Sequence, residues 1–525
     1  MTIAAACQPP ETDRRLPLAR IVATIGPASE SPQMVRSLIE AGVSVFRFNF
    51  SHGSLEDHAR RLAVVREVSA ELERPIAALG DLQGPKIRVG KVPDGGIMLE
   101  SGQDVIFRRG VTMAFTATPI APGEPPRVVF GTTYEPLIDE AVAGHRVLIN
   151  DGLVRLLAIE RSADGHELLC RVTVGGLVTS SKGINLPESE LSAPAISDRD
   201  WACVNWAVEN ALDFLALSFV RKPDEINELR SYLEQAHPTD RRADMQNETA
   251  TIPIIAKIEM PQALKNLEAI IDASDGVMVA RGDLGVEMDI ACVPIAQKAI
   301  VSACNKAGKP CIVATQMLES MITNSTPTRA ESTDIANAIF DGADALMLSG
   351  ETATGQHPLL VVETMTRIAR AAEDHMATLP TDESAPTRLF ESHVPIAALC
   401  RGAWRIASDI KARAVVCWSE RTGTARYLSQ NAFNVPIVAY SSSIRATRRM
   451  ALLRGIHPVC ARPPATGTLG EWNEQVDTYL LAHKLVKEGD PIVLVAGKPL
   501  GQARVTNSIA MHRVGQTQTG YRAVR

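Results

Sequence analysis

The stretch that decides the fold is PIIAKIEMPQALKNLEAIIDASDGVMVARGD, residues 253–283. Two short apolar runs, Pro253–Glu259 and Gly276–Asp283, flank a segment with a helical pattern. Each run is apolar almost throughout, as strands buried on both faces of a parallel sheet require. Each run also ends in charged side chains. The stretch therefore predicts a β–α–β unit with reactive groups at the carboxyl ends of its strands.

Six further runs of the same kind occur along the chain, with helical patterns between them. They are Arg20–Gly26, Val43–Phe50, Pro75–Leu82, Phe214–Val220, Pro310–Gln316 and Ala345–Gly350. Most of the eight runs begin apolar and finish in polar residues that can do chemistry. In a (β/α)8 barrel the active site lies at the carboxyl ends of the strands, so this polarity favours an α/β fold of the TIM-barrel type over an open sheet.

Two other regions lack the barrel pattern. About a hundred residues after the third run show strand-like alternation and turn signals, which predict a small inserted β-barrel domain above the barrel mouth, as a lid. Beyond a polar, proline-containing stretch, more strands and helices alternate. The predicted organisation is a flexible tail at 1–15, the barrel at 16–88 and 185–372, the inserted domain at 89–184, a linker at 373–389 and a C-terminal α/β domain at 390–525.

Composition excludes several classes of protein. The net charge of -6 includes no basic excess, so nucleic acid is not an expected partner. No apolar stretch approaches the length of a membrane span, and the N-terminus lacks the apolar run of a signal peptide. The nine cysteines are scattered and form no Cys-x-x-Cys pair, which predicts reduced thiols and a cytoplasmic location.

The first candidate site is formed by Lys257, Glu259 and Asp283. Residues two apart in a strand point the same way, so Lys257 and Glu259 share one face at the strand exit, and Asp283 ends the next run. Two carboxylates on adjacent strands suit Mg²⁺ or Mn²⁺, which keep waters and take oxygens from a substrate. The alternative is a structural ion pair, but the position at the strand ends favours a metal site.

Two further features indicate an anionic substrate. The glycine-rich turn Gly282–Gly285 enters a helix, and its backbone N–H groups would suit a carboxylate or phosphate. Four cations lie at strand ends or near the junctions of the inserted domain: Arg47, Lys86, Arg88 and Lys182. Together they would neutralise a site that joins two phosphates, although any one alone would be read as a solvated surface charge.

Nine segments together closely resemble the pyruvate kinase family. They are TIGPAS (24–29), RFNFSHG (47–53), GDLQGPKIRVG (80–90), KGINLP (182–187), AKIEMPQALKN (256–266), MVARGDLGVE (278–287), ATQMLESMI (314–322), PTRAE (327–331) and LSGETATGQHP (348–358). The resemblance implies transfer of the phosphoryl group from phosphoenolpyruvate to ADP, giving pyruvate and ATP. It also implies a homotetramer.

The resemblance also implies a role for each matching residue. Glu259 and Asp283 would bind Mg²⁺ (or Mn²⁺), and Lys257 would neutralise charge on the transferring phosphoryl group and on the enolate left behind. The phosphate would be held by Arg47, and the carboxylate by the N–H groups of Gly282 and Asp283 with the Thr315 hydroxyl. The nucleotide would be bound by His52, Arg88 and Lys182.

One departure concerns the monovalent cation. Many members of the family hold K⁺ at positions matching Asn49, Ser51, Asp81 and the carbonyl of Leu82, with a glutamate where this chain has Lys86. Leu82 and Lys86 resemble the branch that does without K⁺. A tethered ammonium can supply the charge of a bound K⁺, so K⁺ is not an expected cofactor.

The C-terminal domain resembles the effector domain of the family. A loop with Ser419, Thr422, Gly423 and Thr424 follows a strand and precedes a helix, where a phosphate could dock. Glu420 would oppose a doubly phosphorylated sugar, so a nucleotide, a sugar monophosphate or no effector is expected. The alternative is an ordinary helix cap by Thr422.

Two competing functions stay open at this point. A metal-dependent carbon–carbon lyase would also stabilise a pyruvate enolate, but it would not need the inserted lid or Lys182. A catalytically silent, effector-binding homologue would be expected to lack Lys257, Arg47 or one of the acids, and all are present.

Overall fold

The computed structural model describes residues 16–117, 126–236, 251–379, 394–431, 433–465, 469–497, 500–502 and 505–516. The predicted tail at 1–15 lies outside these residues, and so does most of the predicted linker. The helix that precedes this linker continues to Met376. The domain limits given above therefore stay predictions.

The predicted TIM barrel is confirmed. Eight parallel strands close on themselves in the order β1-β17-β16-β15-β14-β13-β3-β2. The strands are β1 (Arg20–Thr24), β2 (Val43–Asn49), β3 (Ala77–Asp81), β13 (Phe214–Leu217), β14 (Ile254–Ile258), β15 (Gly276–Ala280), β16 (Cys311–Ala314) and β17 (Ala345–Leu348). The helices around them are α2 (Pro32–Ala41), α3 (Leu55–Glu71), α5 (Asp198–Glu209), α6 (Pro223–Ala236), α8 (Pro261–Lys265), α9 (Leu267–Ala273), α10 (Arg281–Glu287), η1 (Ile290–Cys292), α11 (Val293–Ala307), η2 (Glu319–Ile322), α12 (Arg329–Phe340), α13 (Gly350–Ala353) and α14 (Pro358–Met376).

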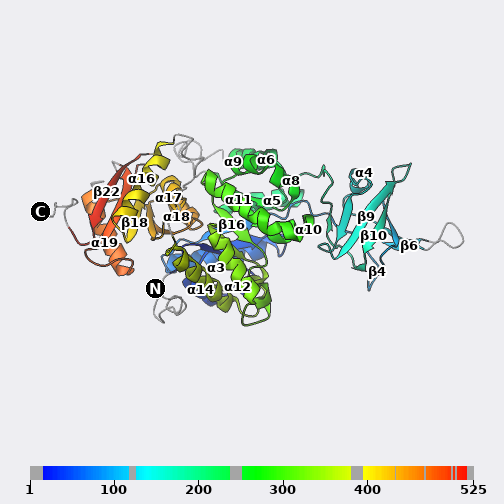
Figure 1. The fold of residues 1–525 in the computed structure, drawn as a ribbon, viewed down its shortest axis with the longest axis horizontal. Coiled ribbons are helices and arrows are strands. Elements are labelled where there is room, and N and C mark those ends of the chain that lie inside the picture. The colour runs from blue at the N-terminus through cyan, green and yellow to red at the C-terminus, as the bar shows by residue number, and fades with distance from the viewer. Residues whose placement is uncertain are drawn as a thin grey trace.

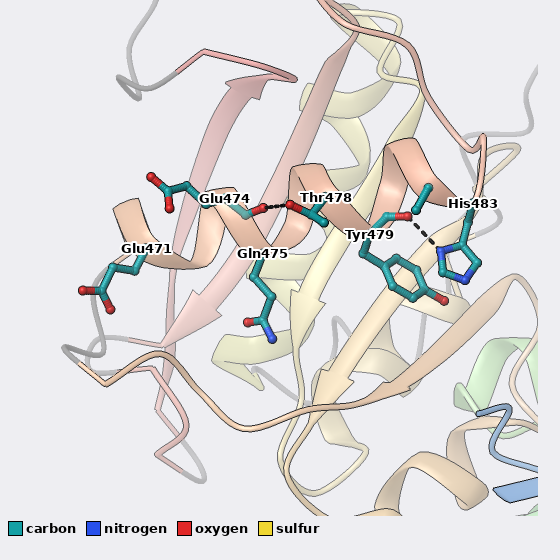
Figure 2. Close-up of a pocket in the computed structure, with 7 residues that line it drawn as sticks. Glu471, Glu474, Gln475, Thr478, Tyr479 and His483 are labelled. Atoms are coloured by element: carbon teal, nitrogen blue, oxygen red, sulfur yellow. Dashed lines mark hydrogen bonds between the residues drawn. The ribbon is translucent and has the colours of Figure 1, made fainter. Parts of the chain in front are cut away.

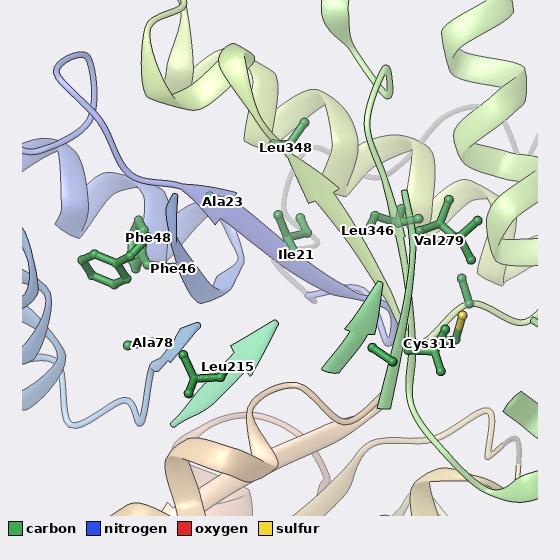
Figure 3. Packing of buried hydrophobic residues seen from close by; sticks show 14 of the residues in the cluster. Ile21, Ala23, Phe46, Phe48, Ala78, Leu215, Val279, Cys311, Leu346 and Leu348 are labelled. Carbon is green, nitrogen blue, oxygen red and sulfur yellow. The ribbon is translucent and has the colours of Figure 1, made fainter. Parts of the chain in front are cut away.

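Two apolar layers hold the barrel together, because successive strand residues point to opposite sides. Ile21 and Ala23 of β1 face the helices, where they join the large cluster shown in Figure 3. Val22 between them faces the barrel interior, with one or two residues from each other strand. Ala451 and Leu452 of the C-terminal domain belong to this inner cluster, so that domain closes the end of the barrel opposite the active site.

The inserted region is a mainly β unit at one end of the elongated molecule (Figure 1). It contains a seven-stranded sheet, ordered β12-β8-β9-β10-β5-β7-β6, and a β11-β4 ribbon. Its elements are β4 (Ile97–Leu99), β5 (Asp104–Arg108), β6 (Phe115–Ala117), β7 (Arg127–Phe130), α4 (Leu137–Glu140), β8 (Arg146–Ile149), β9 (Val154–Arg161), β10 (Glu167–Val174), β11 (Gly176–Val178) and β12 (Ile184–Asn185).

The two chain segments that connect this unit to the barrel pair with each other. Arg88 and Gly183 form an antiparallel bridge. The Val89 N–H donates to the Lys182 carbonyl at 2.8 Å, and the Ile184 N–H donates to the Ile87 carbonyl at 2.9 Å. We call this pair of segments, residues 87–89 and 182–184, the hinge ribbon.

The C-terminal domain lies at the opposite end of the molecule (Figure 1). Its sheet order is β20-β19-β18-β21-β22, with all pairs parallel except β21 and β22. The elements are α16 (Pro395–Asp409), β18 (Ala414–Trp418), α17 (Gly423–Ser429), β19 (Ile437–Ser441), α18 (Ile444–Met450), β20 (Ile456–Cys460), α19 (Leu469–Ala482), β21 (Pro491–Gly497) and β22 (Thr506–Arg513). The predicted parallel strands are confirmed, and the antiparallel edge strand β22 was not predicted.

Among the helices that the structure describes, none is both long enough and apolar enough to cross a bilayer. The eight cysteines in the described ranges are all free thiols.

Candidate active site

The predicted site residues lie at the carboxyl ends of neighbouring strands, β2, β3, β14, β15 and β16. Because the barrel order is β2-β3-β13-β14-β15-β16, only β13 is missing from a continuous arc of the rim. The residues are Arg47 in β2, Asp81 at the end of β3, Lys257 in β14 with Glu259 just beyond it, Asp283 in the first turn of α10 and Thr315 directly after β16.

Asp81 lies between two cations and fixes both. Its carboxylate accepts from Arg47 Nε at 2.7 Å and faces Lys257 Nζ at 3.2 Å. Arg47 also donates to the Thr24 hydroxyl at 3.1 Å. Of the five N–H donors of a guanidinium, these contacts use two, which leaves three for a ligand. The arrangement holds Arg47 in one orientation while part of its donor set stays available.

Lys257 donates one hydrogen bond, to Ser218, and forms ion pairs with two carboxylates. Nζ lies 3.2 Å from Asp81, 2.9 Å from Glu259 and 2.7 Å from the Ser218 hydroxyl. The Ser218 hydroxyl, just after β13, donates a hydrogen bond to the Leu82 carbonyl at 2.7 Å. The missing strand of the arc therefore contributes Ser218. The carboxylate oxygens that face the ammonium, Asp81 Oδ1 and Glu259 Oε1, have no hydrogen-bond partner among the described residues, so a ligand oxygen would have to compete only with their charge.

Burial and neighbouring charges set the protonation of this group of residues. Burial alone would lower the pKa of Lys257, but Asp81 and Glu259 outweigh it and raise that pKa. Burial would raise the pKa of Asp81, yet Lys257 and Arg47 hold it below its usual value. Burial raises the pKa of Glu259 to about 7; Lys257 opposes the shift and Asp283 adds to it. Lys257 is thus a cation and Asp81 an anion at neutral pH, whereas the charge of Glu259 is only partly compensated.

Three bulky residues at the rim adopt left-handed backbone conformations. They are Phe219 (φ 55°), Thr315 (φ 69°) and Gln316 (φ 55°), which L residues other than glycine rarely adopt. The Phe219 N–H donates to Glu259 at 2.6 Å. The Thr315 hydroxyl accepts from the Gly282 N–H at 2.8 Å and donates to the Ala314 carbonyl at 2.6 Å. A strained backbone conformation of this kind persists only where the surrounding contacts impose it, which is common at functional sites.

The structure thus brings Thr315 and Gly282 together, but as partners of each other. The sequence predicted that both would hold a substrate carboxylate. In this structure the Gly282 N–H already has an acceptor in the Thr315 hydroxyl. A carboxylate would have to compete for that donor, and the first-turn position of Asp283 supplies a further N–H that needs no helical partner.

A narrow cleft lies between the barrel rim and the inserted domain. It is lined by Lys86 and Asn185 from the segments next to the hinge ribbon, and by Met260, Asp283 and Glu287 from the barrel. The Asn185 amide donates to Glu287 at 2.7 Å. Burial, with Asp283 as a smaller contributor, raises the pKa of Glu287 to about 7.

The predicted nucleotide residues lie at two places. Arg88 and Lys182 lie on opposite strands of the hinge ribbon, and Arg88 donates to the Ser181 carbonyl at 2.8 Å. His52 is exposed on the loop between β2 and α3.

The predicted monovalent-cation positions are engaged by the protein itself. The Asn49 amide oxygen accepts from the Ser51 N–H at 3.2 Å, and the Leu82 carbonyl accepts from Ser218. Asp81 binds the two cations described above. Lys86 is exposed and makes no hydrogen bond or ion pair within the described ranges.

The C-terminal loop differs from its prediction in detail. Thr422 precedes α17 but its side chain makes no capping hydrogen bond, so the alternative of an ordinary cap is wrong. The Ser419 hydroxyl instead accepts from the Ala425 N–H at 3.1 Å. Thr424 is buried and pairs with the Thr506 hydroxyl at 2.7 Å, and Gly423 begins the helix.

Sequence reasoning did not single out Ser218, Asn185, Arg281 or Glu287. Ser218 had a usable signal, since it is the polar residue that follows the apolar part of the Phe214–Val220 run. The roles of the other three depend on partners far away in sequence.

A second hollow, on α19, contains none of the predicted site residues. Figure 2 shows its lining, which includes Glu471, Gln475, Tyr479 and His483. The rings of Tyr479 and His483 stack with their centroids 4.0 Å apart.

Comparison with known proteins agrees with the rim geometry. The family description "Pyruvate kinase, barrel domain" matches residues 16–362, and "Pyruvate kinase, alpha/beta domain" matches residues 397–512. The chain belongs to the pyruvate kinase family. Pyruvate kinases are phosphotransferases that act on phosphoenolpyruvate and ADP, so the predicted enzyme class is confirmed and the lyase alternative has no support.

Individual relatives match over nearly the full length. A pyruvate kinase of Mycobacterium tuberculosis is 40% identical over 497 residues, which cover 95% of this chain and 98% of the relative. One from Staphylococcus epidermidis is 39% identical over 499 residues, covering 94% and 80%. The crystal structure of a pyruvate kinase from Cryptosporidium parvum superposes with a TM-score of 0.84 at 30% identity, covering 98% of this chain and 100% of that one.

Proposed function

We propose that the barrel rim transfers the phosphoryl group of phosphoenolpyruvate to ADP through Lys257, with Glu259 and Asp283 as ligands of Mg²⁺ (or Mn²⁺). The observation that carries the proposal is the position of Lys257 Nζ between Asp81 and Glu259, at 3.2 and 2.9 Å. A buried, charged ammonium at the strand ends is preorganised for a developing negative charge. Phosphoryl transfer needs positioning and charge stabilisation more than covalent chemistry.

The residues present fit a divalent metal ion. Glu259 is fully buried, and burial raises its pKa, with Asp283 adding to the shift and Lys257 opposing it. Asp283 is half-buried beside it and lines the cleft. Two carboxylates that leave other positions to water and substrate oxygens are typical of Mg²⁺ sites. When bound, the metal would supply positive charge for the phosphate and the enolate oxygen.

Arg47 and Lys257 would hold the transferring group. Arg47 offers the three N–H donors that Asp81 and Thr24 leave free. Of the three partners of Lys257, Glu259 is the one that metal ligation would draw away. The ammonium would then have a donor for a phosphoryl oxygen, while Asp81 and Ser218 keep it in place.

Thr315, Gly282 and Asp283 would hold the carboxylate of the substrate. In this role the Gly282 N–H exchanges the Thr315 hydroxyl for a carboxylate oxygen, and the hydroxyl turns from the Ala314 carbonyl toward the substrate. Thr315 would then adjoin the carbon at which the enolate is protonated.

The nucleotide would enter through the cleft below the inserted domain. Arg88 and Lys182 on the hinge ribbon, with His52 on the rim, would bind the phosphates of ADP. Closure of the inserted domain would exclude water, which otherwise competes with ADP for the phosphoryl group.

A coupled assay for pyruvate tests the proposal. With phosphoenolpyruvate, ADP and Mg²⁺ we expect pyruvate formation that depends on all three. Absence of ADP-dependent pyruvate formation would contradict the main proposal. Glu259→Gln, which keeps the size of the side chain but removes its charge, should raise the Mg²⁺ concentration needed for half-maximal rate.

We also propose that the enzyme does not require K⁺, because Lys86 supplies the cation. Its exposed position in the wall of the cleft leaves the ammonium mobile enough to reach the anionic substrates. Rates in sodium buffer with and without K⁺ should agree, and a large gain on adding K⁺ would contradict the proposal. Lys86→Glu should create K⁺ activation, whereas Lys86→Met should lower the rate without creating it.

A homotetramer, a cytoplasmic location and a phosphorylated effector at the C-terminal loop complete the proposal. Thr422 and Ser419 lie in that loop, but the Glu420 carboxylate beside them favours a singly phosphorylated ligand or none. Light scattering with and without a panel of nucleotides and sugar phosphates tests the assembly, and the coupled assay tests the effectors.

A further inference from the structure

Arg281, the first residue of α10, lies under the rim and is only 9% exposed. Its guanidinium donates to the carbonyl oxygens of Ala314 and Thr315. It also donates to the Gln297 amide oxygen and the Asp334 carboxylate, which belong to α11 and α12. No assigned role in the reaction uses this side chain, although it is the most extensively bonded arginine near the substrate site.

Arg281 bonds the chain at a point where the backbone is strained. Thr315 is β-branched, and its φ of 69° together with the φ of 55° at Gln316 is unfavourable for both residues. Each such conformation costs on the order of 1–3 kcal/mol and persists only where its surroundings impose it. The two carbonyl oxygens bonded by Arg281 lie directly before and within this strained pair.

Arg281 also precedes the residues that the Thr315 hydroxyl faces. Gly282 follows it in the chain and donates its N–H to the Thr315 hydroxyl at 2.8 Å. The backbone and the side chain of the same short segment therefore bind Thr315 from two directions. A shift of Arg281 would move the Thr315 hydroxyl and the Gly282–Asp283 turn relative to each other.

We propose that Arg281 is a positioning residue for the reaction, which acts by holding Thr315 in its left-handed conformation against the Gly282–Asp283 turn. Asp334 and Gln297 orient its guanidinium through the contacts at 2.5 and 3.3 Å. Only a planar fork bonds several acceptors in fixed directions, so lysine cannot replace it. The inference rests on the proposed role of Thr315 in holding the substrate carboxylate.

The test is a double-mutant cycle between Arg281 and Thr315, with kcat and KM measured for each substrate. Arg281→Met should lower kcat/KM for phosphoenolpyruvate at least about tenfold, since a misplacement near 1 Å can cost about a hundredfold. The KM for phosphoenolpyruvate should rise, while the KM for ADP should change less than about twofold, because the proposed nucleotide residues lie elsewhere. A mere loss of folded enzyme would lower the apparent kcat and leave both KM values unchanged. In the Thr315→Ala background, Arg281→Met should cost less than about threefold, since residues that act as a unit are not additive.

Two further variants keep the test decisive. Arg281→Lys retains the charge and should be impaired like Arg281→Met, so it carries the test if the methionine variant does not fold. Arg230 on α6 is the matched control, because it also bonds a carbonyl oxygen, of Ala273 at 2.7 Å, and a carboxylate, of Asp275 at 2.9 Å, but not at the rim. Arg230→Met should leave kcat/KM unchanged while lowering the melting temperature.

The outcomes separate this inference from the proposed function. If Arg281→Met costs the same factor with and without the Thr315 hydroxyl, or if Arg281→Lys is fully active, the inference is overturned while the role of Thr315 stands. If Thr315→Ala is as active as the wild type, the proposed role of Thr315 fails and the inference fails with it.

Discussion

Two threonines in different domains have almost the same unusual backbone conformation, yet they are supported in opposite ways. Thr315 follows a barrel strand with φ 69°, and Thr422 follows a strand of the C-terminal domain with φ 68°. At Thr315 the hydroxyl accepts one hydrogen bond and donates another, and Arg281 bonds its carbonyl oxygen. At Thr422 the side chain makes no capping bond, and its carbonyl accepts the ordinary helical bond from Arg426 at 2.9 Å.

The loops at Thr315 and Thr422 differ in the contacts that hold them. The barrel loop is held by Arg281 and Gly282 of α10, and side chains of α11 and α12 hold Arg281 in turn, so its geometry is set before a ligand arrives. The C-terminal loop is tied mainly by Glu420, which accepts from the Trp418 indole at 2.8 Å and also bonds the Ser442 hydroxyl. A negative side chain thus fills hydrogen-bonding capacity that a phosphate would otherwise use. Under the proposed function, the strained conformation at Thr315 would serve the reaction, whereas the one at Thr422 would not.

The largest effect is expected at Lys257. It tests whether kcat depends on a preorganised charge at the barrel rim and not on a charge in the C-terminal domain. Lys257→Met should bind phosphoenolpyruvate yet lower kcat at least ~10²-fold, the scale for removing one preorganised charge stabiliser. Steady-state kinetics and a direct binding titration separate the two effects. Lys487→Met, at an exposed lysine of the C-terminal domain, is the control. If the kcat of Lys257→Met were within a few-fold of the wild-type value, the proposed difference between the two regions would be contradicted.

Glycine at the two strained positions sharpens the comparison directly. Thr315→Gly should lower kcat/KM for phosphoenolpyruvate by about tenfold to a hundredfold, because it removes the hydroxyl and frees the backbone. Thr422→Gly should leave kcat/KM unchanged and raise the free energy of unfolding by up to about 1 kcal/mol, since relief of strain exceeds the entropic cost of glycine. Kinetics and denaturant unfolding measure both. Equal kinetic effects at the two sites would contradict the comparison.

The proposed metal site provides a pH test that the C-terminal loop should not share. The pKa of Glu259 is raised to about 7 by burial, with Asp283 adding to the shift, so Glu259 holds a proton below that pH. A metal ion must displace this proton, so the apparent dissociation constant for Mg²⁺ should be constant above pH 7 and rise about tenfold per unit below it. Calorimetric titration of Mg²⁺ between pH 6 and 8 measures it. Glu259→Gln should abolish the dependence, and a constant affinity across this range would contradict the assignment.

The smallest expected effect concerns the tie within the C-terminal loop. Glu420→Ala removes the acceptor of Trp418 and Ser442 and should lower the free energy of unfolding by about 1 kcal/mol. The value of kcat without effectors should not change. Glu488→Ala, at an exposed glutamate of the same domain, should have no measurable effect on stability. A loss of activity in Glu420→Ala would indicate that this loop, too, is coupled to the chemistry.

The sequence predicted the barrel because its strands carry a local signal. Buried parallel strands are apolar on both faces and end in polar residues, and the Pro253–Glu259 run has both properties. The fourth run was predicted to continue to Val220, but β13 ends at Leu217. The chain turns there because Phe219 takes a left-handed conformation, and a phenylalanine gives no sequence signal for it.

The site was predictable to the extent that each residue marks the end of its own strand. Lys257 and Glu259 lie two apart and face one another, as strand periodicity required. The hydrogen bond from the Gly282 N–H to the Thr315 hydroxyl was not predictable, because the partners are 33 residues apart and either could serve a ligand. The contacts of Arg281 were not predictable for the same reason, since its acceptors belong to other strands and helices.

The hinge ribbon has a consequence for the order in which the chain folds. The barrel closes only when β3, which ends at Asp81, pairs with β13, which begins at Phe214. Bringing distant segments together costs loop-closure entropy that grows with the length of the intervening chain. Once the inserted domain has folded, residues 87–89 and 182–184 are already side by side, so the effective loop is reduced to the short segments outside the ribbon. The folded inserted domain thus reduces the loop-closure entropy that its own length would otherwise add to the pairing of β3 with β13.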